Sequence, residues 1–405
     1  MPAGYKLTDL GALPEEWEAA PFGQFATPNK AKYNPLTSSK SVPCVELEHV
    51  EQGAGALNGS VDSLGQKSLK SVFKKGSVLF GKLRPYLKKY YLSDFDGVCS
   101  TEIWSLDNTA LTDSRFLYYV VQSDSFIETA NNTTGTRMPR ASWPDVAKAQ
   151  FPLPPLAEQQ AIAAALGEMD ALLAAQRARL AKQRAVKQGL LQGLLSGQQR
   201  LPGFAGDWEV KRLGELADIT KLAGYEYTKH FNSYKDGGEI IVIRGTNITH
   251  NKLDLSDIKT IPRETSKYLK RSQLSVGDMF FAYVGTIGPV YLIEENDRFH
   301  LGPNTAKITA KHELDPQYLF QYFTSQSGLD EMAEHISIGA QPSLSMTKIR
   351  LFKILTPSID EQRAIAAVLS EADAYLAALE AEHAKTQLLK QGMMQNLLTG
   401  KLRLV

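Results

Sequence analysis

Residues 154–166 read PPLAEQQAIAAAL, and residues 357–369 read PSIDEQRAIAAVL. The two segments lie 203 positions apart, and the same offset continues without a gap to Leu-Leu-Ser-Gly at 194–197 and Leu-Leu-Thr-Gly at 397–400. An ungapped internal repeat of this length indicates a duplicated structural unit. The chain therefore reads as a variable segment, a repeat, a second variable segment and a second repeat.

Each repeat has the pattern of a long helix, because apolar residues recur at spacings of four and three. These seam positions are Ile162, Leu166, Met169, Leu173 and Leu180 in the first repeat, and Ile365, Leu369, Leu376 and Leu379 in the second. Prolines precede each pattern, Glu158 and Glu361 fall in the first turns, and Gly197 and Gly400 follow the ends, as is typical of helix boundaries. The sequence predicts two rods of roughly 60 Å, at about 1.5 Å per residue.

Neither rod can bury its apolar seam alone. We predict that the rods pair as an antiparallel coiled coil, with the variable domains at opposite ends and a pseudo-two-fold relation between the halves. Basic residues gather late in the first repeat, at Arg177, Arg179, Lys182, Arg184 and Lys187, and acidic residues gather early in the second, at Glu371, Asp373, Glu380 and Glu382. Antiparallel packing would bring these charges alongside one another. The alternative is that they are only solvated, since exposed ion pairs contribute about 0–1 kcal/mol.

The predicted domains are residues 1–153, 154–199, 200–356 and 357–405, of which the first and third are variable. Both variable segments read as mixed α and β, because apolar runs rich in β-formers are separated by Gly, Asn and Ser. The clearest runs are 42–45, 77–80, 240–243 and 278–284. Asp113 and Asp315 each precede a short aromatic-rich helical run and are predicted to cap it. The predicted fold class is α+β: two globular mixed α/β domains joined by two long antiparallel helices.

Composition excludes several classes of protein. The 405 residues carry a net charge of +1, so any nucleic-acid-binding surface must be local. No apolar run of about 18 residues occurs and the N-terminus lacks an apolar leader, so we expect a cytoplasmic protein with no membrane partner. Cys44 and Cys99 are too far apart in sequence for zinc-knuckle spacing, and the seven histidines are scattered, so no metal site is predicted.

Enzymatic motifs are incomplete. Residues 76–83 nearly spell a phosphate-binding loop, but Leu83 stands where the Mg²⁺-binding Ser or Thr is required. No Gly-x-Gly-x-x-Gly opens a βαβ unit, and residues 34–36 lack the aromatic residue of the adenine-methyltransferase motif. We therefore predict no catalytic residues and no cofactor in this chain.

Several features together resemble the specificity subunit of type I DNA restriction-modification enzymes. They are the duplicated Glu-Gln helix starts, the domain openings Trp17…Phe22-Gly23 and Trp208…Leu213-Gly214, the Gly277-Asp278 pair before an apolar strand, and the Leu-Leu-[Ser/Thr]-Gly helix ends. The resemblance implies that each variable domain is a target-recognition domain for one half of a split duplex DNA sequence. It also implies that the helices space these domains and dock two methyltransferase subunits, and that two restriction subunits can join. S-adenosylmethionine, ATP and Mg²⁺ are then expected in those partners, as is adenine methylation.

Because the two variable segments differ far more than the two repeats, we predict an asymmetric bipartite target. Candidate DNA contacts are polar or basic residues in expected loops, where Arg suits guanine or phosphate. In the first domain they are Lys30, Lys32, Lys82, Arg84, Lys88, Lys89, Arg137 and Arg140; in the second they are Lys221, Tyr225, Lys229, Arg244, Asn247, Arg271, Thr286, Gln341 and Ser343. The rival hypothesis is a coiled-coil scaffold whose globular ends bind proteins.

Overall fold

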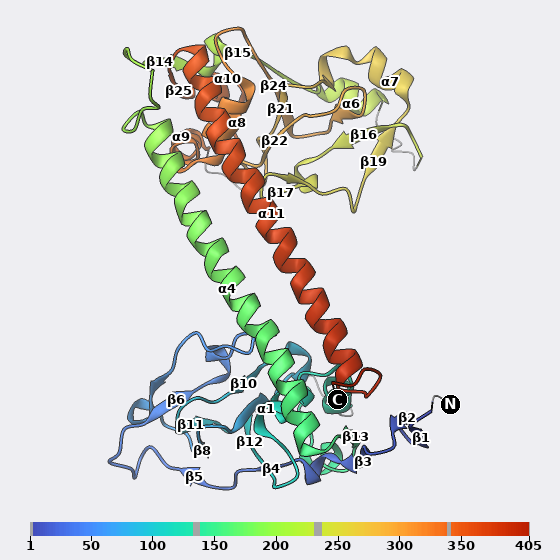
Figure 1. Ribbon diagram of the computed structural model, residues 1–405. Helices are drawn as coiled ribbons and strands as arrows, with labels where there is room; N and C mark the ends of the chain where they lie inside the picture. The colour runs from blue at the N-terminus through green and yellow to red at the C-terminus, as the bar shows by residue number, and fades with distance from the viewer. Residues whose placement is uncertain (1–2, 133–137, 231–236, 338–341, 405) are drawn as a thin grey trace. The chain divides into compact units, whose positions relative to one another are not determined.

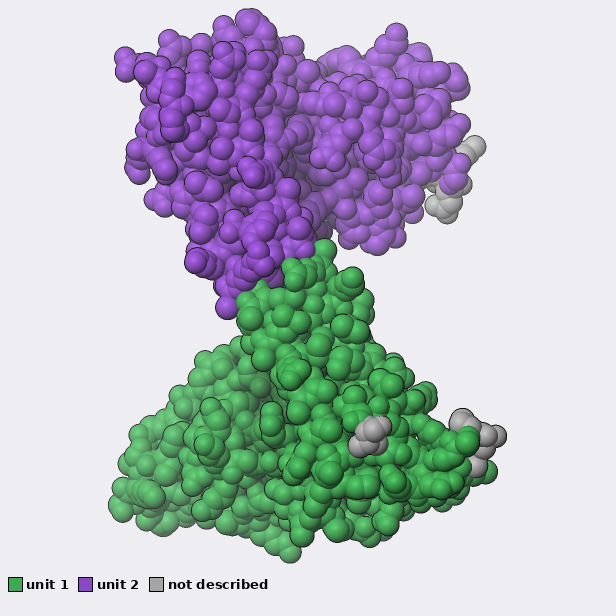
Figure 2. All heavy atoms as spheres, in the orientation of Figure 1, with its two compact units in different colours: residues 1–177, 381–405 green, residues 178–380 purple. Residues whose placement is uncertain are grey.

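Two long helices run through a chain that otherwise forms small sheets and short helices (Figure 1). A computed structural model of the protein describes residues 3–132, 138–230, 237–337 and 342–404. In these residues no helix is both long and apolar enough to cross a membrane. The chain divides into two compact units, residues 1–177 with 381–405 (unit 1) and residues 178–380 (unit 2), coloured separately in Figure 2.

Unit 1 contains the first variable domain, built on two main sheets. The antiparallel sheet has the order β10-β9-β12-β4, and the second sheet has the order β5-β8-β11-β6-β7 with a parallel β11–β6 pair. The strands of these sheets are β4 (Ala26–Pro28), β5 (Lys32–Tyr33), β6 (Pro43–Val45), β7 (Val61–Asp62), β8 (Lys70–Phe73), β9 (Val78–Gly81), β10 (Tyr90–Leu92), β11 (Gly97–Ser100) and β12 (Ile103–Asn108). Two small ribbons pair β1 (Tyr5–Thr8) with β2 (Gly11–Pro14) and β3 (Glu18–Pro21) with β13 (Gln150–Leu153).

Short helices pack on these sheets and close the core of unit 1. The α-helices are α1 (Ser114–Val120), α2 (Asp124–Asn131) and α3 (Trp143–Val146), and the 3₁₀ turns are η1 (Phe22–Gln24), η2 (Leu47–His49), η3 (Ser63–Gly65) and η4 (Pro85–Leu87). The core is aromatic: the rings of Phe22 and Phe126 lie 4.8 Å apart, and Phe80 and Phe126 meet edge to face at 5.1 Å. The aromatic run beginning at Phe116 belongs to this core.

Unit 2 repeats the four-stranded antiparallel sheet of unit 1, and its second sheet has four described strands where that of unit 1 has five. Its sheets have the orders β15-β24-β21-β22 and β19-β16-β23-β20, the second with a parallel β16–β23 pair, and β14 pairs with β25. The strands are β14 (Glu209–Arg212), β15 (Ala217–Lys221), β16 (Ile240–Ile243), β17 (Ile248–Thr249), β18 (Lys252–Leu253), β19 (Lys259–Ile261), β20 (Gln273–Leu274), β21 (Asp278–Ala282), β22 (Val290–Leu292), β23 (Phe299–Leu301), β24 (Thr305–Ala310) and β25 (Lys353–Thr356). Thus β9, β10 and β12 correspond to β21, β22 and β24.

Among the described residues, unit 2 has six short α-helices where unit 1 has three. They are α5 (Leu213–Leu216), α6 (Gly224–His230), α7 (Arg263–Tyr268), α8 (Pro316–Thr324), α9 (Gln326–His335) and α10 (Met346–Arg350), with 3₁₀ turns η5 (Gly245–Asn247) and η6 (Lys270–Ser272). The predicted N-caps are confirmed, since Asp113 accepts from the backbone amide of Phe116 at 3.1 Å and Asp315 from that of Tyr318 at 2.9 Å. The run predicted as a strand over 278–284 ends at Ala282, because Val284 pairs instead with Ser343 in an isolated bridge.

The two repeats form α4 (Leu156–Leu195) and α11 (Ile359–Leu397), the long helices that the sequence predicted. Each unit contains one part of each helix, and within each unit the two parts run antiparallel. In unit 1, for example, Asp170 contacts Lys390 while Glu158 contacts Arg403. Of the predicted seam residues, seven are buried: Ile162, Leu166, Leu173, Leu180, Ile365, Leu369 and Leu379. Met169 and Leu376 are half-buried.

Candidate nucleic-acid interface and its helical frame

A buried carboxylate fastens the start of α4 in unit 1. The Glu158 side chain is 2% exposed and accepts from Trp17 Nε1 at 2.7 Å, from Arg403 Nε at 2.7 Å and from Arg403 Nη2 at 2.8 Å. Gly400, which ends the second repeat with φ +71°, packs against the Trp17 ring, so that an added Cβ would lie 3.3 Å from it. We call Trp17, Glu158, Gly400 and Arg403 the first clasp. It joins the start of one repeat to the end of the other.

Unit 2 contains an equivalent second clasp, made of Trp208, Glu361, Gly197 and Arg200. Glu361 is 1% exposed and accepts from Trp208 Nε1 at 3.1 Å and from Arg200 Nε and Nη2 at 2.6 and 2.8 Å. Gly197 also has φ +71° and lies against the Trp208 ring. The two clasps use the same four residue types, three of them at the repeat offset of 203 positions. The duplicated motif therefore binds the start of each repeat to the end of the other repeat.

The glutamine that follows each glutamate binds the variable domain through its backbone. Gln159 accepts from the amide of Asp113 at 2.9 Å and donates to the carbonyls of Leu111 and Pro154, both at 2.9 Å. In unit 2, Gln362 repeats this arrangement with Asp315 N at 2.9 Å, Glu313 O at 3.0 Å and Pro357 O at 2.9 Å. Both glutamines are 0% exposed. Each amide thus connects a long helix to the N-cap of α1 or α8.

The sequence interpretation missed the clasps, although it noted every residue type in them except the arginines. It treated Glu158 and Glu361 only as acidic residues of a first turn. The missing signal was the pair Arg200 and Arg403, which lies at the same offset three residues after the helix-ending glycines.

The predicted pairing of charges between the helices is confirmed at two positions in unit 2. Arg184 Nη2 lies 2.7 Å from Glu380 Oε1, and Lys187 forms an ion pair with Asp373. Arg179 instead bonds to the Tyr375 hydroxyl and lies over that ring at 5.4 Å. Hydrogen bonding to Arg184 is the main cause that lowers the pKa of Glu380. These side chains are partly exposed, so they set the alignment of the helices more than their stability.

Several residues of the first domain that were predicted to contact DNA are bonded to other groups of the protein. The engaged ones are Lys32 with Ser71 Oγ at 3.0 Å, Lys88 with Asp124 at 3.0 Å, Lys89 with the Leu47 carbonyl at 2.6 Å and Arg140 with Glu102 at 3.0 Å. Lys30, Lys82 and Arg84 have no side-chain partner among the residues that the structure describes. Arg137 lies outside the described residues. The structure brings Lys82, Arg84 and Arg140 together, because Leu83 and Arg140 form a β-bridge.

The candidates of the second domain also divide. Those exposed at the surface include Tyr225, which is 73% exposed, Lys229, Arg271 and Thr286. Lys221 lies over the Tyr283 ring at 6.0 Å. Ser343 forms a β-bridge with Val284, close to Thr286 in the chain. Arg244 is bonded to Asp257 at 3.0 Å. Gln341 lies outside the described residues.

The structure corrects one of these candidates. Asn247 is 3% exposed, and its amide accepts from Arg244 N and donates to the carbonyls of Asp254 and Asp257. Because every polar atom of this side chain is used inside the loop, Asn247 shapes the loop and is not available for contact with DNA.

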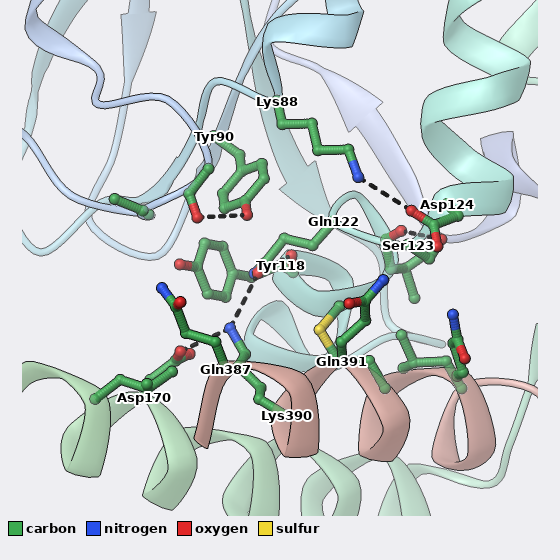
Figure 3. A pocket seen from close by; sticks show the side chains of 18 of the residues that line it. Lys88, Tyr90, Tyr118, Gln122, Ser123, Asp124, Asp170, Gln387, Lys390 and Gln391 are labelled. Atoms are coloured by element: carbon green, nitrogen blue, oxygen red, sulfur yellow. Dashed lines mark hydrogen bonds and ion pairs between the residues drawn. The ribbon is translucent and has the colours of Figure 1, made fainter. Parts of the chain in front are cut away.

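A cavity of about 750 Å³ in unit 1 lies between the first variable domain and the two helices (Figure 3). Lys390 lines this cavity. Its Nζ lies 2.6 Å from Asp170 and 3.3 Å from Gln122, and 5.5 Å from the centre of the Tyr119 ring. The Tyr119 hydroxyl donates to the same aspartate at 2.8 Å. The corresponding pair in unit 2 is Lys187–Asp373. There the Gln321 side-chain amide donates to Asp373 at 2.9 Å, in the role that the Tyr119 hydroxyl has in unit 1. The sequence interpretation did not predict this polar junction, since its members come from three separate segments.

Cys44 in β6 and Cys99 in β11 are free and buried. Burial is the main cause that raises the pKa of each thiol to about 12. A thiol of this kind is inert as a nucleophile at neutral pH. Among the residues described, no group of His, Cys, Asp and Glu has the arrangement of a metal site.

Comparisons with known proteins place this architecture in a family. The sequence model described as "Type I restriction modification DNA specificity domain" matches residues 14–182 and 205–390. The type I restriction enzyme MjaVIII specificity subunit of Methanocaldococcus jannaschii is 22% identical over 411 residues, covering 96% of this chain and 94% of that protein. The EcoDI specificity subunit of Escherichia coli is 28% identical over 161 residues, covering 39% of this chain and 36% of that protein.

Solved structures share the fold. A chain from a study of complex assembly and conformational transition of the type I R-M system matches with a TM-score of 0.63 and 22% identity, covering 96% of this chain and 99% of that chain. The S subunit of a type I restriction-modification system from M. genitalium matches with a TM-score of 0.58 and 14% identity, covering 98% and 99% of the two chains.

The chain belongs to the type I restriction-modification DNA specificity family, whose domain it carries twice. Its role is DNA sequence specificity, and the resemblance seen in the sequence is confirmed.

Proposed function

We propose that this chain reads an asymmetric bipartite sequence in duplex DNA, one half with each variable domain. The observation that supports the proposal most directly is the contrast between a duplicated frame and two different surfaces. Both clasps and both buried glutamines recur with equivalent partners, whereas equivalent loops carry different residues, such as Glu-Leu-Glu at 46–48 and Arg-Gly-Thr at 244–246. Base pairs present distinct donor and acceptor patterns in the major groove, so two unlike surfaces select two unlike half-sites.

The proposal assigns the long helices a second role. Phosphate contacts fix position and base contacts fix sequence, so two readers held by a rigid connection leave the base pairs between them unread. Helices of 40 and 39 residues are suitable for this connection. Their outer faces are proposed to dock two methyltransferase subunits, as the family resemblance implies, and restriction subunits can join the complex.

Catalysis is proposed to reside in those partners, with this chain as their noncatalytic subunit. S-adenosylmethionine is then bound by the methyltransferase, which modifies adenine, and ATP and Mg²⁺ are bound by the restriction subunit. The complex is proposed to act in the cytoplasm on the chromosome.

A domain exchange tests the proposal. Residues 24–140 would be replaced by the equivalent segment of another family member, leaving Trp17, Glu158 and Gln159 in place. The complex with the methyltransferase would then be expressed, and methylated genomic DNA would be sequenced. We expect a discontinuous motif in which one half changes and the other half and the gap are retained. The control replaces residues 217–340 and should change only the other half. Motifs that stay unchanged after both exchanges would favour the rival hypothesis, a scaffold whose globular ends bind proteins.

A further inference from the structure

The turn after β9 differs from its counterpart in unit 2 in one unusual respect. In unit 2 the backbone enters the left-handed region at Gly285, with φ +78°, and again at Gly288, with φ +109°. In unit 1 the corresponding positions are occupied by Arg84, with φ +53°, and Lys88, with φ +49°. Glycine is the usual residue at such positions because it has no Cβ to crowd the backbone. Unit 1 therefore has two long cationic side chains at positions where unit 2 has glycine.

Two anchors at the start of this turn are matched between the units. The amide of Arg84 donates to the carbonyl of Pro139 at 2.8 Å, as the amide of Gly285 does to that of Pro342 at 3.2 Å. The two turns are further matched by the bridges of Leu83 with Arg140 and of Val284 with Ser343. Since the equivalent amide bond and bridge form beside a glycine in unit 2, these anchors do not themselves require a side chain at this position. Non-glycine residues kept in the left-handed region concentrate at functional sites.

The side chains of the turn separate into one that supports the loop and two that face outward. Lys88 is bonded to Asp124 at 3.0 Å, and its carbonyl accepts from Gly53 at 2.9 Å, so it holds the turn against its neighbours. Arg84 is exposed, and its guanidinium has no partner within the part of the chain that the structure describes. Tyr86 is 50% exposed, although a tyrosine ring loses apolar contacts when it stays in water.

The turn is also firmly anchored. Pro85 between the two outward residues is buried, and η4 packs against α2. Arg84 and Tyr86 are thus two positions apart on a short 3₁₀ turn whose backbone is fixed at both ends. Pre-organised arginine and aromatic side chains lose little freedom on binding, and Arg matches the O6 and N7 acceptors of guanine in a bidentate way.

We infer that Arg84 and Tyr86 are specificity-determining residues for the first half-site, with Arg84 donating to a guanine and Tyr86 contacting the adjacent base pair. The inference rests on the proposed function and adds to it which residues of unit 1 read bases. Lys88 and Lys89 act as positioning residues of the same turn. The left-handed backbone at Arg84 is tolerated because the side chain is needed at that place.

The test is Arg84→Gly, which places in unit 1 the glycine that unit 2 has at the equivalent position, Gly285. The variant complex with its methyltransferase would be expressed, the methylated genomic DNA sequenced, and the melting temperature of the purified chain measured. We expect a melting temperature equal to or above that of the unaltered protein, because glycine relieves the backbone. We also expect one guanine of one half-site to become degenerate, with about 5- to 150-fold weaker discrimination there, and the other half-site to be retained. Tyr86→Ala should relax the neighbouring position in the same half.

The matched control is Lys75→Ala, which removes one exposed positive charge at the opposite end of β9 and should leave both half-sites unchanged. Three outcomes overturn the inference: an unaltered motif in Arg84→Gly, a uniform loss of methylation at all sites without a change of sequence, or a lowered melting temperature. The uniform loss would identify Arg84 as a phosphate contact. Failure of the proposed function is distinguishable, because the unaltered complex would then give no bipartite motif at all.

Discussion

Arg403→Met should destabilise unit 1, because Arg403 is bonded to the buried carboxylate of the first clasp. The substitution keeps an unbranched apolar stem and removes the guanidinium, which supplies two of the three hydrogen bonds that Glu158 accepts. Glu158 is 2% exposed, so water cannot fully replace the lost donors. Breaking a buried ion pair from one side costs about 3–5 kcal/mol. Trp17 Nε1 remains as a donor and Arg403 is 24% exposed, so we reduce the expected loss to about 2–4 kcal/mol.

The loss should appear as a lower melting temperature of unit 1, by about 5–12 °C for a unit of this size. Denaturant unfolding followed by tryptophan fluorescence is a suitable assay, because Trp17 is in the clasp. The matched variant Arg200→Met should destabilise unit 2 by a similar amount, since Arg200 bonds to Glu361 in the same bidentate manner.

A double substitution separates the buried charge from packing. Glu158→Gln combined with Arg403→Met removes both charges while leaving an acceptor for Trp17, so it should be less destabilised than Arg403→Met alone. The reasoning is refuted if Arg403→Met costs no more than an exposed pair, under about 0.5 kcal/mol, or if the double variant is the less stable of the two.

Three further expectations concern single residues. Gln159→Leu, and likewise Gln362→Leu, should each lower the free energy of unfolding by about 2–4 kcal/mol in urea titrations, because three buried backbone groups lose their partner. Arg244→Ala should destabilise unit 2 by about 1–2 kcal/mol through the lost bonds to Asp257, and an unchanged salt dependence of DNA binding would show that its role is structural. His300 is 0% exposed and burial lowers its pKa below the ordinary 6.5, so unit 2 should lose stability as the pH falls below about 6.5; thermal melts of His300→Gln should lack that slope.

The helical frame could be predicted from sequence because its signals are periodic and repeated. Spacings of four and three located the seam, and the recurrence of Gly197 and Gly400 located the helix ends to within a few residues. The partners of Glu158 could not be predicted in the same way, since Trp17 and Arg403 are 141 and 245 positions away. Periodicity reports which face of a helix is buried and does not report which distant group it meets.

Recognition residues were harder to predict, because surface charge alone does not separate a ligand contact from an internal bond. Lys89 and Arg244 satisfy the compositional criteria for DNA contacts, yet each is bonded within its own loop. The backbone angle at Arg84 is also invisible in the sequence until the turn is aligned with Gly285. That comparison requires the structure, because one turn is longer than the other by one residue.

The buried glutamines explain how one frame can carry two unlike reading surfaces. Gln159 and Gln362 bond to backbone groups alone: one amide and one carbonyl of the variable domain, and the carbonyl of a proline that precedes their own helix. A backbone partner is present whatever side chain the position carries, so substitutions in the variable domain leave these bonds intact. The clasps likewise depend on tryptophans at the domain entrances and not on the loops. Fastening and recognition therefore use separate groups of atoms, and the recognition surfaces can change without loss of the frame.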